Sequence, residues 1–306
     1  MGSFRLSRRA LIGALGLAGL GACSRDPGKP AAEPALALPA PTPGSLEWGA
    51  AGAWRIAADR DTWRHPVETL KFFGIRSNMT VLEVLPGQGW YSAVLAPYLA
   101  RGGGKLYAAT FNPEGASPAQ LETVKAYRDR FLADKATFGG VEMTVLDPKG
   151  GRLAPDDSCD LALIMRNMHT LMAMGAAEQV LRDVMRALKP GGVLGIEQHR
   201  GKATGLQDPQ AASGYVQEAF VKQIASEAGF EFVGASQINA NPKDDREHPF
   251  GVWSLPPVLR TAPLGSPPDP SFDTAPYDAI GESDRMTLKF RKPLTPPAPL
   301  KSGGGR

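Results

Sequence analysis

The sequence has few cysteines, almost balanced charge and only a short apolar run near its N-terminus. Its 306 residues include two cysteines, Cys23 and Cys159, and 34 basic against 31 acidic side chains. A net charge of +3 does not demand a nucleic-acid partner, and we predict none. The uncharged run Ala10–Ala22 is too short and too rich in glycine for a membrane span, which needs ~20 predominantly apolar residues.

Residues 1–23 have the pattern of an export signal rather than of a fold element. Ser7-Arg8-Arg9 resembles a twin-arginine export signal, and Leu20-Gly21-Ala22-Cys23 resembles a lipobox, in which Cys23 is lipidated and becomes the mature N-terminus. The alternative is an ordinary signal peptide with a chance cysteine. We therefore predict an exported protein, lipid-anchored at Cys23 to a membrane that faces the periplasm or the cell exterior. Ser24 is not an aspartate retention mark, which favours an outer membrane where the host has one.

The rest of the chain divides into a tether, a folded domain and a tail. Residues 24–45 are rich in Pro and Ala and are predicted to form a semi-extended tether. Residues 46–293 are long enough for one α/β domain with insertions, and residues 294–306 are predicted to be a disordered tail. Once Cys23 is acylated, Cys159 is the remaining thiol, so it cannot form an intramolecular disulfide and is expected to pack as a small buried hydrophobe.

Strand-like and helix-like patterns alternate between Gly74 and Arg200, which indicates a parallel sheet covered on both faces. Strands are predicted over 80–86, 105–111, 141–147, 159–166 and 192–198, and helices over 90–100, 117–135, 176–189 and 215–228. Strands at 230–238 and 285–291 follow, and we expect the last strand to run antiparallel beside 230–238. The excursion 239–284 between them is then expected to lie outside the sheet, as a lid or substrate wall.

The run Thr80–Tyr91 combines a buried strand, a glycine turn and a helix start. Gly87 and Gly89 have no Cβ, so backbone N–H groups and the positive end of the next helix can approach a ligand closely. Glu83, at the end of the strand, can accept hydrogen bonds from a ribose or an amino group. The run lacks the third glycine of the dinucleotide fingerprint, so it indicates a nucleotide-like ligand without defining it.

The order of elements resembles that of class I S-adenosylmethionine-dependent methyltransferases, with Val81-Leu-Glu-Val-Leu-Pro-Gly-Gln-Gly89 at its head and Leu188-Lys-Pro-Gly-Gly-Val-Leu194 before the fifth strand. More specifically, the sequence resembles a bacterial family of exported "predicted methyltransferases". It matches at Pro86–Tyr91, Arg166–His169, His199-Arg200, Ile238–Pro242, Gly251–Pro257 and Ser283–Lys289. The resemblance covers residues 60–293 and implies a Rossmann-like methyltransferase fold, with a mostly parallel seven-stranded sheet, an antiparallel last strand and helices on both faces. It also implies S-adenosylmethionine as cofactor and methyl transfer to an unidentified small molecule.

The resemblance assigns the cofactor loop to Glu83, Pro86, Gly87, Gln88 and Gly89, and the adenine contact to Asp147. Leu85 stands where the superfamily usually has its first glycine, and Thr110 where an acidic residue normally holds both ribose hydroxyls. Loss of that charge-assisted pair costs about 1.5–3 kcal/mol of binding free energy. Asn112 or Glu114 can substitute from the following turn.

Polar side chains follow the fourth and fifth predicted strands, where ligands bind in open α/β sheets. Arg166 and His169 come after the fourth strand, and Glu197, His199 and Arg200 end the fifth. We predict His169 and His199 as catalytic, with His169 as base or acceptor-orienting group, and Arg166 or Arg200 as the partner of an anionic group. The alternative is that both histidines are structural. A metal site of His169, Glu197 and His199 is also compatible with the sequence, but the spacing is not diagnostic, and we predict no metal.

Asn239 and Asn241 begin the excursion. Their side chains either bind a ligand or stabilise an ordinary Asn-Pro turn. The aromatic residues near the N-terminal end of the domain are expected to pack in the core: Trp63, Phe72, Phe73, Trp90 and Tyr91. A second function stays open, that of a non-catalytic ligand-binding lipoprotein that keeps the methyltransferase fold. The missing acid at Thr110 favours it, and so does export, because S-adenosylmethionine is made in the cytoplasm.

Overall fold

The computed structural model describes residues 39–295. The predicted export signal with Cys23, most of the tether 24–45 and all but the first two residues of the tail 294–306 lie outside the described residues. Within 39–295, none of the helices combines the length and the apolar character that a membrane crossing requires.

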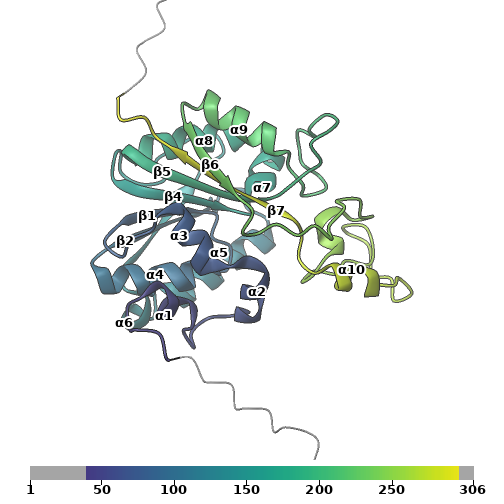
Figure 1. The fold of residues 1–306 in the computed structure, drawn as a ribbon, viewed down its shortest axis with the longest axis horizontal. Coiled ribbons are helices and arrows are strands. Elements are labelled where there is room, and N and C mark those ends of the chain that lie inside the picture. The colour runs from purple at the N-terminus through teal and green to yellow at the C-terminus, as the bar shows by residue number, and fades with distance from the viewer. Residues whose placement is uncertain (1–38, 296–306) are drawn as a thin grey trace, which may run out of the picture. The chain divides into compact units, whose positions relative to one another are not determined.

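A seven-stranded sheet in the order β3-β2-β1-β4-β5-β7-β6 forms the centre of the fold (Figure 1). The strands are β1 (Thr80–Val84), β2 (Lys105–Phe111), β3 (Val141–Leu146), β4 (Cys159–Met165), β5 (Leu188–His199), β6 (Glu231–Ser236) and β7 (Arg285–Arg291). The first five strands pair in parallel, and β7 runs antiparallel between β5 and β6. The predicted mostly parallel sheet with an antiparallel last strand is confirmed.

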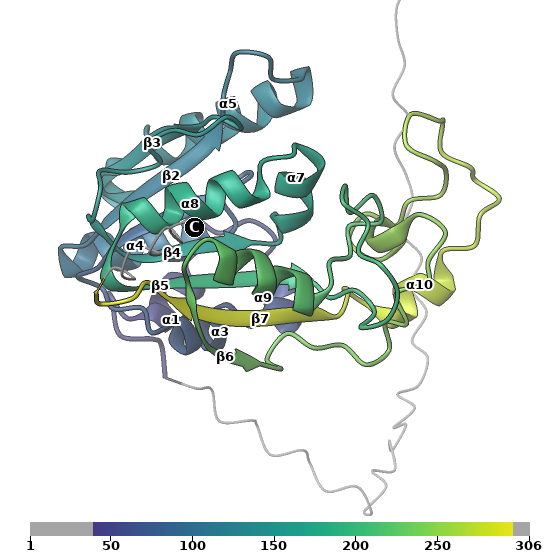
Figure 2. The same cartoon turned by 90° about the horizontal axis from the view of Figure 1, so that it is seen from above.

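Helices cover both faces of this sheet (Figure 2). They are α1 (Leu46–Ala50), α2 (Asp61–Arg64), α3 (Pro66–Phe73), α4 (Ser92–Gly102), α5 (Pro118–Phe131), α6 (Lys135–Phe138), α7 (Met168–Ala173), α8 (Ala177–Ala187), α9 (Glu218–Glu227) and α10 (Ala275–Ile280), with 3-10 turns at Ala58–Arg60 and Gly251–Ser254. Neighbouring residues of a strand point to opposite faces. Leu82 therefore packs with the core under α7, α8 and α9, whereas Val81 packs with the core under α1, α3, α4 and α5.

Several predicted boundaries differ from the structure for local reasons. The helix predicted over 117–135 ends at Phe131, and the short helix α6 follows under its own cap, the Asp134 carboxylate, which accepts from the Thr137 amide. The helix predicted from residue 215 begins at Glu218, because Val216 forms an isolated bridge with Arg200. Strand β5 begins at Leu188 rather than 192, since Leu188 already pairs with β4.

The excursion 239–284 lies outside the sheet, as predicted, and carries α10 (Figure 1). Asn239 is 2% exposed and its amide donates to Thr69 Oγ1 and Thr287 Oγ1. The Asn241 amide donates to the carbonyls of Ile280 and Glu282. Both asparagines therefore tie the ends of the excursion together, which favours the turn chemistry over ligand binding.

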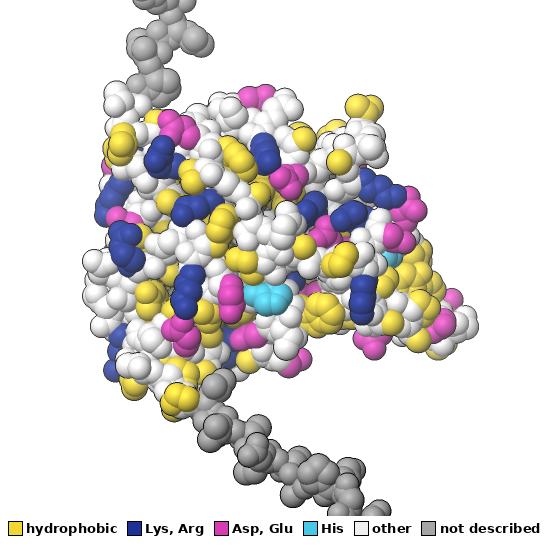
Figure 3. All heavy atoms as spheres, viewed as in Figure 1, with side chains coloured by type: hydrophobic (Ala, Val, Ile, Leu, Met, Phe, Trp, Pro, Cys, Tyr) yellow, Lys and Arg dark blue, Asp and Glu magenta, His cyan; other side chains and the backbone are white. Residues whose placement is uncertain are grey.

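The surface carries no extended region of one charge on the face shown in Figure 3, where basic and acidic side chains are interspersed. In the core, Cys159 is a free and fully buried cysteine, and burial raises the pKa of its thiol to about 11. It packs as the predicted small hydrophobe.

Candidate functional site

A cavity of about 440 Å³ opens between the glycine turn after β1, the ends of β4 and β5, and the excursion. Its walls come from parts of the chain that are distant in sequence: the segment before α3, the turn after β1, α5, the ends of β4 and β5, and the excursion. The charged and imidazole side chains that line it are Arg60, Arg64, Glu83, Arg130, Arg166, His169, His199 and Glu282.

The glycine turn follows β1 with unusual backbone angles. Gly87 has φ +61°, and a Cβ at this position would meet no atom within 4 Å, so the residue faces open space in the cavity wall. Leu85 has φ +50°, a left-handed angle that L side chains rarely adopt. The Leu85 carbonyl is held by the Asn167 side-chain amide at 2.7 Å, and its N–H donates to Ala109. Leu85 thus holds a left-handed backbone conformation that glycine adopts more readily.

Gly89 has a different role from Gly87. It has φ +80°, and a Cβ there would lie 2.1 Å from Phe131 Cε2 and 3.1 Å from Tyr127 Cε2. Gly89 does not line the cavity. It lets α5 pack closely against the turn, which holds the turn in place.

Glu83 lies at the base of the cavity and is 2% exposed. Its carboxylate accepts a hydrogen bond of 2.5 Å from Ser92 Oγ, and Ser92 in turn accepts from the Tyr127 hydroxyl at 3.0 Å. Burial raises the pKa of Glu83 to about 7, and the Ser92 hydrogen bond opposes part of that rise. Near neutral pH this carboxyl group can therefore donate or accept a hydrogen bond.

The residues predicted to hold the adenosine part of a cofactor do not line the main cavity. Thr110 is 6% exposed, its hydroxyl donates to the Thr144 carbonyl, and it borders only a small separate hollow beside Pro86 and Gly87. Asp147 accepts from the Lys149 amide, and Asn112 from the Glu114 amide. Both side chains close their own turns, so only the loop part of the predicted cofactor site, Glu83, Pro86, Gly87 and Gln88, lines the cavity.

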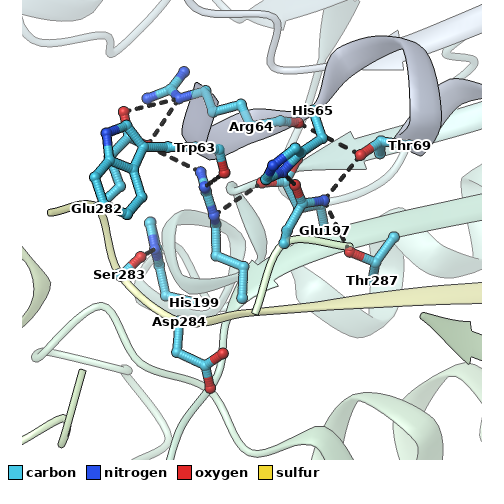
Figure 4. Close-up of polar contacts among 12 residues, drawn as sticks. Trp63, Arg64, His65, Thr69, Glu197, His199, Glu282, Ser283, Asp284 and Thr287 are labelled. Atoms are coloured by element: carbon cyan, nitrogen blue, oxygen red, sulfur yellow. Dashed lines mark hydrogen bonds and ion pairs between the residues drawn. The ribbon is translucent and has the colours of Figure 1, made fainter. Parts of the chain in front are cut away.

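His169 and His199 meet at the ends of β4 and β5, with ring centroids 5.5 Å apart. His169 Nδ1 lies 3.2 Å from Gln198 Nε2. His199 Nδ1 lies 2.6 Å from Ser283 Oγ, as Figure 4 shows. The pKa of His169 is lowered to about 4, mainly by burial and to a smaller extent by the charge of Arg166, against a hydrogen bond to Gln198 that raises it. Burial also lowers the pKa of His199 well below its usual value, with His169 and Arg166 adding to the effect. Both imidazoles are therefore neutral at pH 7.

Glu197, at the end of β5, belongs to a buried network rather than to the histidine pair. It accepts from the Tyr91 hydroxyl at 2.9 Å and lies 3.3 Å from Arg285 Nε. Among the described residues, only Asp244, Asp245 and His248 bring three metal-ligating atoms within 4.8 Å of one another. Among the described residues, the structure thus does not bring the ligating atoms of His169, Glu197 and His199 within that distance of one another.

The two predicted anion partners differ in position. Arg166 lines the cavity, but Arg200 does not, since it donates to Gln237 and to the Arg285 carbonyl and pairs with Asp284. Sequence reasoning missed Arg60, Arg64 and Glu282. The arginines precede α3 and have no motif of their own, and the prediction for the excursion that carries Glu282 is a lid or substrate wall, without named charged residues.

Comparisons with known proteins identify the fold. No family model matches the sequence, and no curated protein matches it. Among solved structures, the [4+2]-cyclase SpnF has a TM-score of 0.51 at 16% identity, over 80% of this chain and 86% of that chain. A SAM-dependent methyltransferase from Aquifex aeolicus has a TM-score of 0.47 at 22% identity, over 59% of this chain and 87% of that chain. Haemonchus contortus phosphoethanolamine N-methyltransferase 2, in complex with S-adenosyl-L-methionine, has a TM-score of 0.48 at 15% identity, over 76% of this chain and 53% of that chain.

The α/β fold of this chain is shared with SpnF. SpnF is named as a cyclase, so the fold by itself does not decide the reaction. The residues of this chain fit S-adenosylmethionine at the glycine turn and at Glu83, where the cavity is open. They fit it less well at Thr110 and Asp147, whose side chains are engaged elsewhere.

Proposed function

We propose that this protein is an S-adenosylmethionine-dependent methyltransferase that acts on a small molecule outside the cytoplasm. The observation that carries the proposal is the single cavity that joins the glycine turn after β1 to the paired histidines at the ends of β4 and β5. In this fold class ligands bind outside the carboxyl ends of the strands, at the point where the strand order reverses. Here β1 and β4 flank that point.

Gly87, Gln88 and Glu83 would hold the cofactor, whose sulfonium supplies the methyl group when it is bound. Gly87 permits close backbone approach, and Glu83 can accept or donate a hydrogen bond because its pKa is about 7. His169 and His199 each have Nδ1 hydrogen-bonded to the protein. This leaves Nε2 of each ring without a hydrogen bond to the rest of residues 39–295, free to orient an acceptor.

A neutral imidazole with a pKa of about 4 is a weak proton acceptor at pH 7. His169 is therefore better suited to orient the acceptor than to remove its proton in the empty site. A negative charge bound beside Arg166 would offset the effect of that arginine and raise the pKa of His169 toward the range of a useful base.

Substitution of Gly87 by valine tests the cofactor site. We expect S-adenosylhomocysteine to bind the purified chain and to bind Gly87→Val about 10 to 100 times more weakly, since the new side chain enters the cavity wall. Calorimetry measures the two affinities. Gly115→Val is the matched control, because Gly115 has a similar φ of +79° in an exposed turn outside the cavity. Absence of binding to the wild-type chain contradicts the proposal.

The adenosine side of the site favours a second function. In this alternative the protein is a ligand-binding lipoprotein without transfer chemistry. Its support is that Thr110 and Asp147 are engaged by their own neighbours and do not line the cavity. Protein exported in its native host, denatured and examined by mass spectrometry, separates the two. A released adenosyl sulfonium favours the enzyme, and another metabolite favours the binding protein.

Anchoring at Cys23 is a separate proposal that rests on the Leu20–Cys23 motif. We expect Cys23→Ser to leave the protein without lipid, either soluble after cleavage or retained as a precursor, because the serine hydroxyl cannot replace the thiol that is lipidated. Membrane fractionation and the mass of the mature N-terminus measure this. Unchanged fractionation of Cys23→Ser would count against the lipobox.

A further inference from the structure

Arg64 is a fully buried arginine with unused hydrogen-bond donors. It is 0% exposed and lines the cavity, yet neither Nη1 nor Nη2 has a hydrogen-bond partner among residues 39–295. Buried polar groups are nearly always paired, and leaving one unpaired costs about 1–3 kcal/mol. A guanidinium with two unpartnered nitrogens in a residue that lines a cavity is suited to a ligand with two acceptor oxygens.

Contacts on the other side of Arg64 fix its orientation. Its Nε donates to Glu282 Oε2 at 2.9 Å (Figure 4). Its Cζ lies 4.9 Å from the centroid of the Trp90 ring. The orientation of the guanidinium is thus set by protein groups that leave both terminal nitrogens without a partner among residues 39–295. Little side-chain freedom remains to be lost when a ligand binds, which favours affinity.

The charges around Arg64 do not balance. Glu282 pairs with Arg60, Arg64 and Arg285, so one carboxylate serves three guanidinium groups. Glu197 is the other acid in contact with this group, through Arg285. Arg166 adds a further positive charge, so two carboxylates face four guanidinium groups. The cavity wall therefore carries an excess of positive charge that a bound anion would balance.

Arg166 provides a second unpaired donor at the same cavity. Its Nε is buried and without a partner, and its side chain makes no hydrogen bond to any other described residue. It lies beside His169 and His199, and lowers the pKa of both. An acid bound there would lie next to the imidazoles that orient the acceptor.

We propose that Arg64 and Arg166 bind an acidic group of the methyl acceptor, a carboxylate or a phosphate monoester. The assignment of this group to the acceptor rests on the proposed function, whereas the anion site itself rests on the two arginines. The substrate class is therefore a small organic acid or phosphate ester.

Inorganic phosphate and malonate are the probes that test the anion site on the purified full chain. We expect either anion to raise the thermal midpoint and to give measurable heat in calorimetry. Arg64→Met should weaken that binding about 10 to 100 times, since the paired charge-assisted donors are lost. Arg64→Lys keeps the charge and a donor for Glu282 but lacks the fork, so it should bind with intermediate affinity.

Arg182→Met is the matched control, because Arg182 is an exposed arginine on α8 that contacts Gln179 and should leave anion binding unchanged. Arg64→Met retains Arg60 and Arg285 as partners of Glu282, which favours folding of this variant. If the methionine variant does not fold, the anion affinity of Arg64→Lys tests the proposal. Equal anion binding by wild type and Arg64→Lys, or no binding by wild type, overturns the proposal.

Competition with cofactor analogues separates this proposal from the proposed function. We expect the anion to bind together with S-adenosylhomocysteine. If the anion competes with S-adenosylhomocysteine but not with methylthioadenosine, which has no carboxylate, the arginines hold the cofactor and the assignment to the acceptor is wrong. If S-adenosylhomocysteine does not bind but phosphate binds through Arg64, the proposed function fails and the anion site stands.

Discussion

Replacement of Gly89 by alanine is expected to destabilise the protein by about 2–5 kcal/mol. Two costs add at this position. The backbone has φ +80°, where a Cβ is strained, and the new methyl group would lie 2.1 Å from Phe131 Cε2. Phe131 is itself fully buried and stacked on Tyr127 with ring centroids 4.4 Å apart, so it has no free space into which to move. Chemical denaturation measures the change in the free energy of unfolding.

Gly87→Ala and Gly115→Ala are the controls for the strain alone. Both glycines have positive φ, and a Cβ at either would meet nothing within 4 Å. We expect each to lose about 1–2 kcal/mol. If Gly89→Ala costs no more than these two variants, the close packing of α5 on the turn does not hold the site in place. The expected larger loss for Gly89→Ala would show that Gly87 faces the ligand site whereas Gly89, two positions later in the same turn, is a packing residue.

Glu83→Gln should stabilise the protein at pH 8 by about 3 kcal/mol and have little effect at pH 4. The folded-state pKa of Glu83 is raised from 4.5 to about 7, so the fold favours the protonated form. The folded state then binds more protons than the unfolded state between these values, and wild-type stability falls as the pH rises from 4.5 to 7. Glutamine removes this dependence and can still accept from Ser92 Oγ. Denaturation of wild type and Glu83→Gln at a series of pH values measures the difference in their free energies of unfolding.

His169 provides a comparison of opposite sign. Its folded-state pKa is lowered from 6.5 to about 4, so the unfolded state binds the extra proton and stability falls as the pH decreases through that window. His169→Gln should therefore gain stability relative to wild type below pH 5, whereas Glu83→Gln gains above pH 6. Glu122→Gln, on an exposed residue of α5, is the control. A Glu83→Gln difference that is the same at pH 4 and pH 8 would show that Glu83 titrates normally.

The sequence predicted the sheet well because its signals are local. Buried strands such as Lys105–Phe111 and Arg285–Arg291 match their predicted ranges residue for residue, since apolar runs and alternation depend only on neighbouring side chains. The antiparallel position of the last strand was also predicted. Helix ends were predicted less well, because caps and single bridges decide them, as at Asp134 and Val216.

The amino-acid sequence by itself determined the fold class, the glycine turn and the meeting of His169 and His199 at one edge of the sheet. These follow from strand order, since the carboxyl ends of parallel strands share an edge. Only the tertiary structure decided which residues face the cavity. In it, Thr110 and Asp147 form hydrogen bonds with backbone groups of the protein instead of lining the cavity. Arg64 and Glu282 come into contact although 218 positions separate them. Such contacts depend on how distant segments pack, and no local pattern encodes them.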